Sequence, residues 1–140
     1  MEKGLKELRD YFGLHEAEPE SLSPLTLAYI GDAVFELIVR YIEIERAKIP
    51  VSRLHKASSR IVCAESQSEM TAVIEPLLEE KELHIYRRGR NAKSNTTAKN
   101  ASVTDYRRAT GFEALFGYLF LKGEHERLLE LAEKAIAAKL

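Results

Sequence analysis

The stretch LTLAYIGDAVFELIVRYIEI, which spans residues 25–44, decides the fold of this chain. Ser23 and Pro24 stand immediately before it. Because a proline in the first turn of a helix loses no hydrogen bond, this pair predicts a helix start. Apolar residues occupy nearly every face of the predicted helix, and a helix of that kind is normally buried at the centre of a domain. We therefore expect residues 25–44 to form the centre of the protein.

The rest of the chain also predicts helices rather than strands. No Asn-Gly or Asp-Gly hairpin turn occurs, and the chain has only 7 glycines and 4 prolines. The further predicted helices span about residues 3–11, 50–75, 77–86, 104–121 and 124–138. The sequence therefore predicts an all-α fold, a single helical domain of six to seven helices over residues 1–140. Within it, residues 1–21 form an N-terminal helix and loop, and residues 90–103 form a basic polar loop.

Composition and charge limit the classes of function. The 140 residues are 45% hydrophobic and 31% charged, which is typical of a globular chain. A net charge of −1 excludes a protein that holds nucleic acid by bulk positive charge, so such binding requires a local basic patch. The N-terminus lacks the apolar run of a signal peptide, and the single cysteine, Cys63, cannot form an intrachain disulfide. We therefore expect a protein of the reducing cytosol with no membrane partner.

Two acidic residues interrupt the most apolar stretches of the sequence. Asp32 lies within residues 25–44 and follows Gly31, which costs a helix about 1 kcal/mol relative to alanine. Glu113 is the only charge in TGFEALFGYLFL, residues 110–121. Because a buried carboxylate without a partner is unstable, each acid requires a cation. Gly117, one turn after Glu113, would let another helix approach closely and bring the two acids together.

The residues alone leave two interpretations of these acids open. In the first, each carboxylate pairs with an arginine or caps a neighbouring helix and has only a structural role. In the second, the two carboxylates converge and hold a hard divalent cation such as Mg²⁺, which prefers oxygen ligands. A zinc site is not supported, because the cysteine stands alone and the 4 histidines show no ligand spacing.

Basic residues are concentrated between Ile85 and Arg108. Seven lysines and arginines stand there against Asp105 alone, a charge of +6, and polar donors lie among them. Contacts with a phosphate backbone require this combination, whereas the alternative is an ordinary solvated loop. The candidate RNA-binding residues are Arg87, Arg88, Arg90, Asn91, Lys93, Ser94, Lys99, Arg107 and Arg108.

Three short motifs, in this order, resemble those of a known family. They are GDAV at residues 31–34, YRRGRNAK at 86–93 and FEAL at 112–115. With them the chain, from about residue 22 to its C-terminus, resembles the ribonuclease III catalytic domain and, within that family, the Mini-III subfamily. The resemblance implies a dimeric, all-helical endoribonuclease that cuts double-stranded RNA using Mg²⁺, for which Mn²⁺ can substitute. It also implies that no separate double-stranded RNA-binding domain is present.

The resemblance carries roles over to two residues and shows a reduced site. Asp32 and Glu113 match the family's metal ligands and would be the catalytic residues. The longer ribonuclease III enzymes carry further acids at the positions of Leu25, Ala28 and Thr110. Loss of those outer acids leaves a non-cutting homologue that only binds RNA as an alternative, and a helical protein-interaction domain is a second one.

Further residues are candidates for supporting roles. Glu65 and Glu36 are possible auxiliary acids or structural residues, and Tyr29 and Phe35 are expected at the interface of the homodimer. Hydrolysis would leave a 5′-phosphate and a 3′-hydroxyl. The resemblance also implies a substrate and a partner: precursor large-subunit ribosomal RNA, and a ribosomal protein bound to it.

Overall fold

The computed structural model describes residues 2–16, 18–47, 50–92 and 102–139. These residues form helices and contain no strand, which confirms the predicted all-α fold. No helix among them is both long and apolar enough to cross a membrane. The elements in chain order are α1 (Glu2–Phe12), the short 3₁₀ helix η1 (Pro19–Ser21), α2 (Pro24–Ala47), α3 (Val51–Val62), α4 (Ala64–Ile74), the 3₁₀ helix η2 (Glu75–Leu77), α5 (Glu80–Asn91), α6 (Val103–Lys122) and α7 (His125–Ala137).

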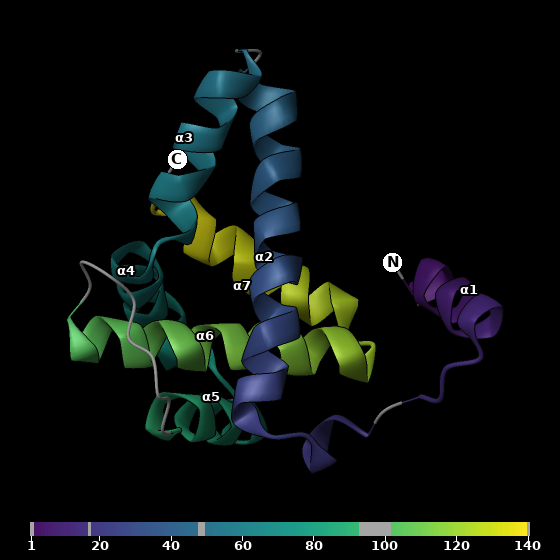
Figure 1. The fold of residues 1–140 in the computed structure, drawn as a ribbon. Helices are drawn as coiled ribbons and strands as arrows, with labels where there is room; N and C mark the ends of the chain where they lie inside the picture. The colour runs from purple at the N-terminus through teal and green to yellow at the C-terminus, as the bar shows by residue number, and fades with distance from the viewer. Residues whose placement is uncertain (1, 17, 48–49, 93–101, 140) are drawn as a thin grey trace.

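Helix α6 lies at the centre of the fold, and this corrects the expectation for residues 25–44. Helices α2, α4 and α5 pack against α6, and α2 crosses it steeply in Figure 1. From Ala109 to Leu119 every residue of α6 except Glu113 is buried. Helix α2 instead keeps one side open to solvent, where Tyr29 is 83% exposed and Leu37 is 65% exposed. The apolar residues of α2 therefore form two faces, one that packs in the core and one that is exposed to solvent.

Two glycines allow α2 and α6 to cross in direct backbone contact. A Cβ atom on Gly31 would lie 1.7 Å from the carbonyl oxygen of Glu113, and one on Gly117 would lie 1.9 Å from the carbonyl oxygen of Leu27. Both distances are far below any van der Waals contact, so no larger residue fits at either position. The glycine that weakens α2 as an isolated helix is thus required by its packing.

Three phenylalanines form the core beneath this crossing. The ring centroids of Phe35 and Phe112 lie 4.9 Å apart in an edge-to-face arrangement, and Phe116 lies 5.4 Å from Phe35. Such aromatic pairs add to the stability that burial provides. Because Phe35 is 0% exposed, its predicted place at the dimer interface is wrong. It faces α6, on the side of α2 away from the open face.

Helix ends differ from the sequence prediction at two places. The predicted helix 50–75 is interrupted at Cys63, whose extended backbone (ψ 158°) separates α3 from α4 and leaves its side chain exposed. Helix α5 continues through Arg90 and Asn91, which the sequence placed in a loop. Gly89 explains the continuation, because it is buried against Ala114 of α6 and tertiary packing there outweighs weak helix propensity. Of the predicted loop 90–103, residues 93–101 lie outside the described residues.

Candidate active site

The crossing of α2 and α6 brings Asp32 and Glu113 together. Asp32 follows the contact glycine of α2, and Glu113 supplies the carbonyl that this glycine touches. The charge of Asp32 acts on the Glu113 carboxyl, and the two side chains are hydrogen-bonded. Two acids separated by 81 positions in the sequence are therefore adjacent in space.

The two carboxyls lie in unequal surroundings, which partly corrects the expectation that both are buried. Asp32 is exposed, whereas Glu113 is half-buried. Burial raises the pKa of the Glu113 carboxyl to about 9, and the charge of Asp32 and the hydrogen bond with it act in the same direction. Glu113 therefore holds a proton at neutral pH. Any cation that binds both carboxylates must displace this proton, so its binding strengthens as the pH rises toward 9.

The described residues supply no positive charge to this pair. Neither acid forms an ion pair with a lysine or arginine there, so pairing with arginine has no support in the described structure. No group of three or more histidine, cysteine or acidic residues capable of holding a metal occurs among the described residues. Two carboxylates, one facing solvent, fit Mg²⁺, which keeps several water ligands and needs only one or two protein carboxylates beside substrate phosphates.

The structure does not bring the two candidate auxiliary acids into this pair. Glu36 forms an ion pair with Arg40, one turn further along α2, at 2.7 Å. Glu65 is exposed in the first turn of α4. At the position where the longer enzymes have an aspartate, the buried Thr110 donates its hydroxyl to the carbonyl of Tyr106 at 3.0 Å. Among the described residues, the candidate site therefore consists of Asp32 and Glu113 alone.

Basic residues from two helices gather where α5 and α6 pack together. The last turns of α5 carry Arg87, Arg88 and Arg90, and the first turns of α6 carry Arg107 and Arg108. Helices α5 and α6 pack side by side, so these residues approach one another although residues 93–101 separate the helices in sequence. Arg87, Arg107 and Arg108 are exposed, and Arg88 and Arg90 are half-buried. The candidates Lys93, Ser94 and Lys99 lie outside the described residues.

Tyr86 links the two groups of basic residues. The guanidinium of Arg90 lies 5.8 Å from the centre of the Tyr86 ring. Burial and Glu75 raise the pKa of the Tyr86 hydroxyl, while Arg90 and Arg108 act in the opposite direction, so both arginines lie near this one side chain. The sequence analysis contains Tyr86 only as the first residue of the motif YRRGRNAK and does not predict this contact. The YRRGR motif contains Tyr86, but the contact between its ring and Arg90 is visible only in the folded structure.

Comparison with known proteins identifies this all-helical chain as a member of a class of endoribonucleases. Residues 25–124 match the ribonuclease III domain. A Mini-ribonuclease 3 of Brevibacillus brevis is 46% identical over 120 residues, covering 86% of this chain and 90% of its own. A Mini-ribonuclease 3 of Thermoanaerobacter is 52% identical over 116 residues, covering 83% of this chain and 82% of its own.

A solved structure supports the same relationship. The crystal structure of a Fusobacterium nucleatum protein superposes with a TM-score of 0.78 at 29% identity, over 86% of this chain and 96% of that one. The chain belongs to the ribonuclease III family. It resembles Mini-ribonuclease 3 proteins over most of its length, and it is an endoribonuclease. Enzymes of this family act on double-stranded RNA and depend on a divalent metal.

Proposed function

We propose that Asp32 and Glu113 form the catalytic metal site of this endoribonuclease, with Mg²⁺ as the natural ion and Mn²⁺ as a substitute. The observation that carries the proposal is their juxtaposition at the α2–α6 crossing without a neutralising cation among the described residues. Without a bound cation, the half-buried Glu113 holds a proton, and the loss of this proton gives a second carboxylate that can bind a positive charge. Two helices in backbone contact fix its geometry.

The two acids divide the work according to their surroundings. Asp32, which is exposed, and Glu113, which is half-buried and would first release its proton, would together hold the cation. When bound, the metal lowers the pKa of water and neutralises charge at the scissile phosphate. Attack by water on phosphorus breaks the bond to the 3′ oxygen, which takes a proton. The products are a 5′-phosphate and a 3′-hydroxyl, and no side-chain nucleophile is needed.

The arginines of α5 and α6 are proposed to position the RNA backbone. They lie in the last turns of α5 and the first turns of α6, and Arg87, Arg107 and Arg108 are exposed. Lys93, Ser94 and Lys99, between the two helices in sequence, and Asn91, at the end of α5, are proposed to extend this surface. Contacts of this kind follow the shape of an A-form duplex rather than its sequence. We propose that the natural duplex is precursor large-subunit ribosomal RNA in the cytosol, presented together with a ribosomal protein.

Replacing Arg87, Arg88 and Arg90 together by alanine should weaken duplex binding and reduce its dependence on salt. Each lost phosphate contact removes nearly one unit from the slope of log affinity against log salt, so we expect a slope smaller by about 2 to 3 units. Filter binding at several salt concentrations measures this slope. Cleavage at saturating RNA should persist. An unchanged slope would mean that these arginines form only a solvated surface.

The open face of α2 supports a homodimer. Tyr29, Ala33, Leu37 and Tyr41 recur every four residues and are all exposed, Tyr29 to 83% and Tyr41 to 65%. A contiguous apolar face of this kind is typical of a protein interface. A two-fold axis beside it would present two Asp32–Glu113 sites symmetrically to the antiparallel strands of one duplex. Each site would then cut one strand.

Mixed dimers test this arrangement and the site together. A dimer of one wild-type subunit and one Asp32→Asn subunit should nick a single strand, because only one complete acid pair remains. Strand-specific end labels on a synthetic duplex distinguish a nick from a double-strand break. Double-strand breaks made in a single binding event would contradict the proposal, as would active protein that sediments as a monomer.

A further inference from the structure

Helix α1 is an amphipathic helix without a packing partner within the described structure. Leu5, Leu8 and Phe12 recur at spacings of three and four residues and form one apolar face. Leu8 is 48% exposed and Phe12 is 75% exposed, and no described side chain of α1 is buried. Figure 1 shows α1 standing apart from the other helices. Because isolated helices of 11 residues are marginal in water, a docking surface for this face is expected.

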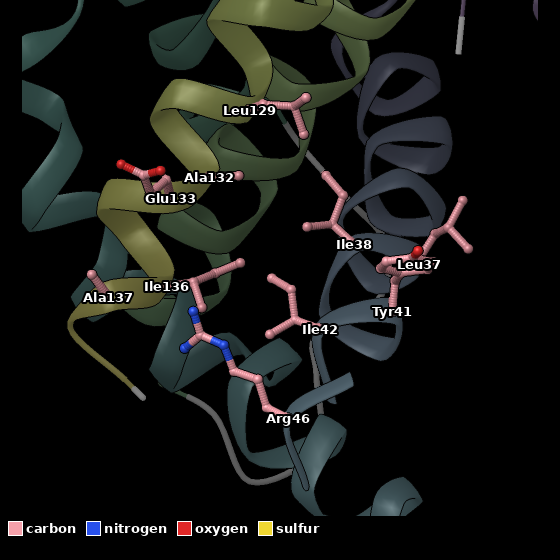
Figure 2. A pocket seen from close by; sticks show the side chains of 10 residues that line it. All are labelled: Leu37, Ile38, Tyr41, Ile42, Arg46, Leu129, Ala132, Glu133, Ile136 and Ala137. Atoms are coloured by element: carbon pink, nitrogen blue, oxygen red, sulfur yellow. The ribbon is translucent and has the colours of Figure 1, made fainter. Parts of the chain in front are cut away.

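A groove between α2 and α7 offers an apolar surface of matching size. It encloses about 810 Å³, and Figure 2 shows Ile38 and Ile42 of α2 facing Leu129 and Ile136 of α7. From Leu37 to Arg46 its α2 wall is about 14 Å long, and Leu5 to Phe12 of α1 extends about 10 Å. A helix presenting residues i, i+3 and i+7 is the usual occupant of such a groove.

The lining of the groove carries one charge of each sign, Glu133 and Arg46. Arg9, which flanks the apolar face of α1, is complementary in charge to Glu133. Neither side chain forms an ion pair within the described part of the chain. Docking of α1 would therefore bury its leucines and phenylalanine while placing one unpaired positive charge beside one unpaired negative charge.

The root of α1 is fixed to the body of the protein. Glu20 accepts hydrogen bonds from Lys122 at 2.8 Å and from Tyr118 at 3.1 Å, and it pairs with Lys81 at 3.0 Å. Lys122 and Lys81 lower the pKa of Glu20 to about 2, so this anchor persists at any physiological pH. From Pro19, which is buried, the chain to Phe12 can extend about 24 Å. Helix α1 is thus connected by a short segment to an anchored point of the chain at Pro19 and Glu20.

The groove is continuous with the open face of α2, because Leu37 and Tyr41 belong to both. We propose that α1 of one subunit docks in the α2–α7 groove of a second copy of this chain. Each subunit then gives one helix and receives one, as two-fold symmetry requires. This exchange covers the apolar face of α1, the groove and the adjoining α2 surface in a single interface. The inference rests on the proposed homodimer and deepens it.

Disulfide trapping between two different chains tests the exchange. One chain carries Phe12→Cys and the other Leu129→Cys, both with Cys63→Ser to remove the exposed native thiol. Mild oxidation of the mixture should link the two chains, visible as a covalent dimer on a non-reducing gel. A chain with Lys6→Cys, on the opposite face of α1, is the matched control and should link poorly with Leu129→Cys. A chain carrying both Phe12→Cys and Leu129→Cys should form linked dimers.

A second measurement separates this inference from the proposed dimer itself. Leu8→Asp with Phe12→Asp should weaken self-association about a hundredfold in sedimentation experiments, whereas Lys3→Asp with Lys6→Asp, on the polar face, should not. If the doubly substituted cysteine chain closes on itself and the mixture does not link, α1 docks within its own subunit and the exchange is wrong. A stable dimer without any link would overturn the exchange alone. A wild-type protein that sediments as a monomer would overturn both the exchange and the dimer.

Discussion

Replacing Asp32 by asparagine is expected to lower the rate of RNA duplex cleavage by roughly a hundredfold to a thousandfold. The substitution removes one of the two charges that attract the metal and changes the volume of the side chain very little. Glu113→Gln should have an effect of similar size, since its neutral amide cannot release a proton to become a ligand. Single-turnover cleavage of a synthetic duplex, with Mg²⁺ or with EDTA, measures both effects.

Two controls make this result specific to the site. Glu45→Gln removes an acid from the exposed end of the same helix and should cleave at the wild-type rate. Duplex binding by Asp32→Asn should remain, because the basic residues lie on α5 and α6. Cleavage by Asp32→Asn at the wild-type rate would show that Asp32 is not part of the active site. A wild-type protein that binds duplex without cutting it, with metal present, would favour a non-catalytic RNA-binding protein.

Replacing Gly31 by alanine is expected to destabilise the protein by about 3 kcal/mol or more. The new Cβ atom would lie 1.7 Å from the backbone carbonyl oxygen of Glu113, and a backbone atom cannot move aside as the end of a side chain can. The two helices must separate, which also parts the two acids. Urea unfolding measures the loss of stability, and the cleavage assay measures the loss of activity at a temperature where the variant is folded.

Gly4→Ala is the matched control for this substitution. It also lies in a helix, but a Cβ there meets nothing within 4 Å, so only the gain in helix propensity remains. Its stability should equal or slightly exceed that of the wild type. If Gly31→Ala were as stable and as active as Gly4→Ala, the close crossing of α2 and α6 would not be what positions the site.

The sequence was sufficient to predict the helical fold and to single out the two acids, and it left open whether they converge. Asp32 and Glu113 stand out because each is a charge within an otherwise apolar helix, and Gly117 marks the close approach. A charge within an apolar stretch and a nearby glycine can be identified from neighbouring residues in the sequence, without knowing which helix packs against them. For the same reason the sequence could not separate the two sides of α2, because both are apolar. Phe35, facing α6, and Tyr29, facing solvent, look alike in sequence.

Helix ends were harder to predict where tertiary contacts decide them. Gly89 and the polar residues around it favour a loop, yet α5 continues to Asn91 because Gly89 packs against α6. The pattern from Pro50 to Glu75 has helical spacing throughout, yet the chain bends at Cys63. The exposed apolar faces of α1 and α2 can likewise be identified only from the positions of the other helices. A pattern of apolar residues indicates burial but not which neighbour provides it.

Binding of Mn²⁺ to the free protein, followed by its electron paramagnetic resonance signal at about pH 7 and about pH 9, tests the central claim most directly. We expect the wild type and Glu45→Gln to bind the ion more tightly at the higher pH, since the pKa of Glu113 is about 9 and its proton must leave. Asp32→Asn and Glu113→Gln should each lose at least about tenfold in affinity. Equal affinity in the wild type and both site variants would contradict the assignment of these two acids as the metal site.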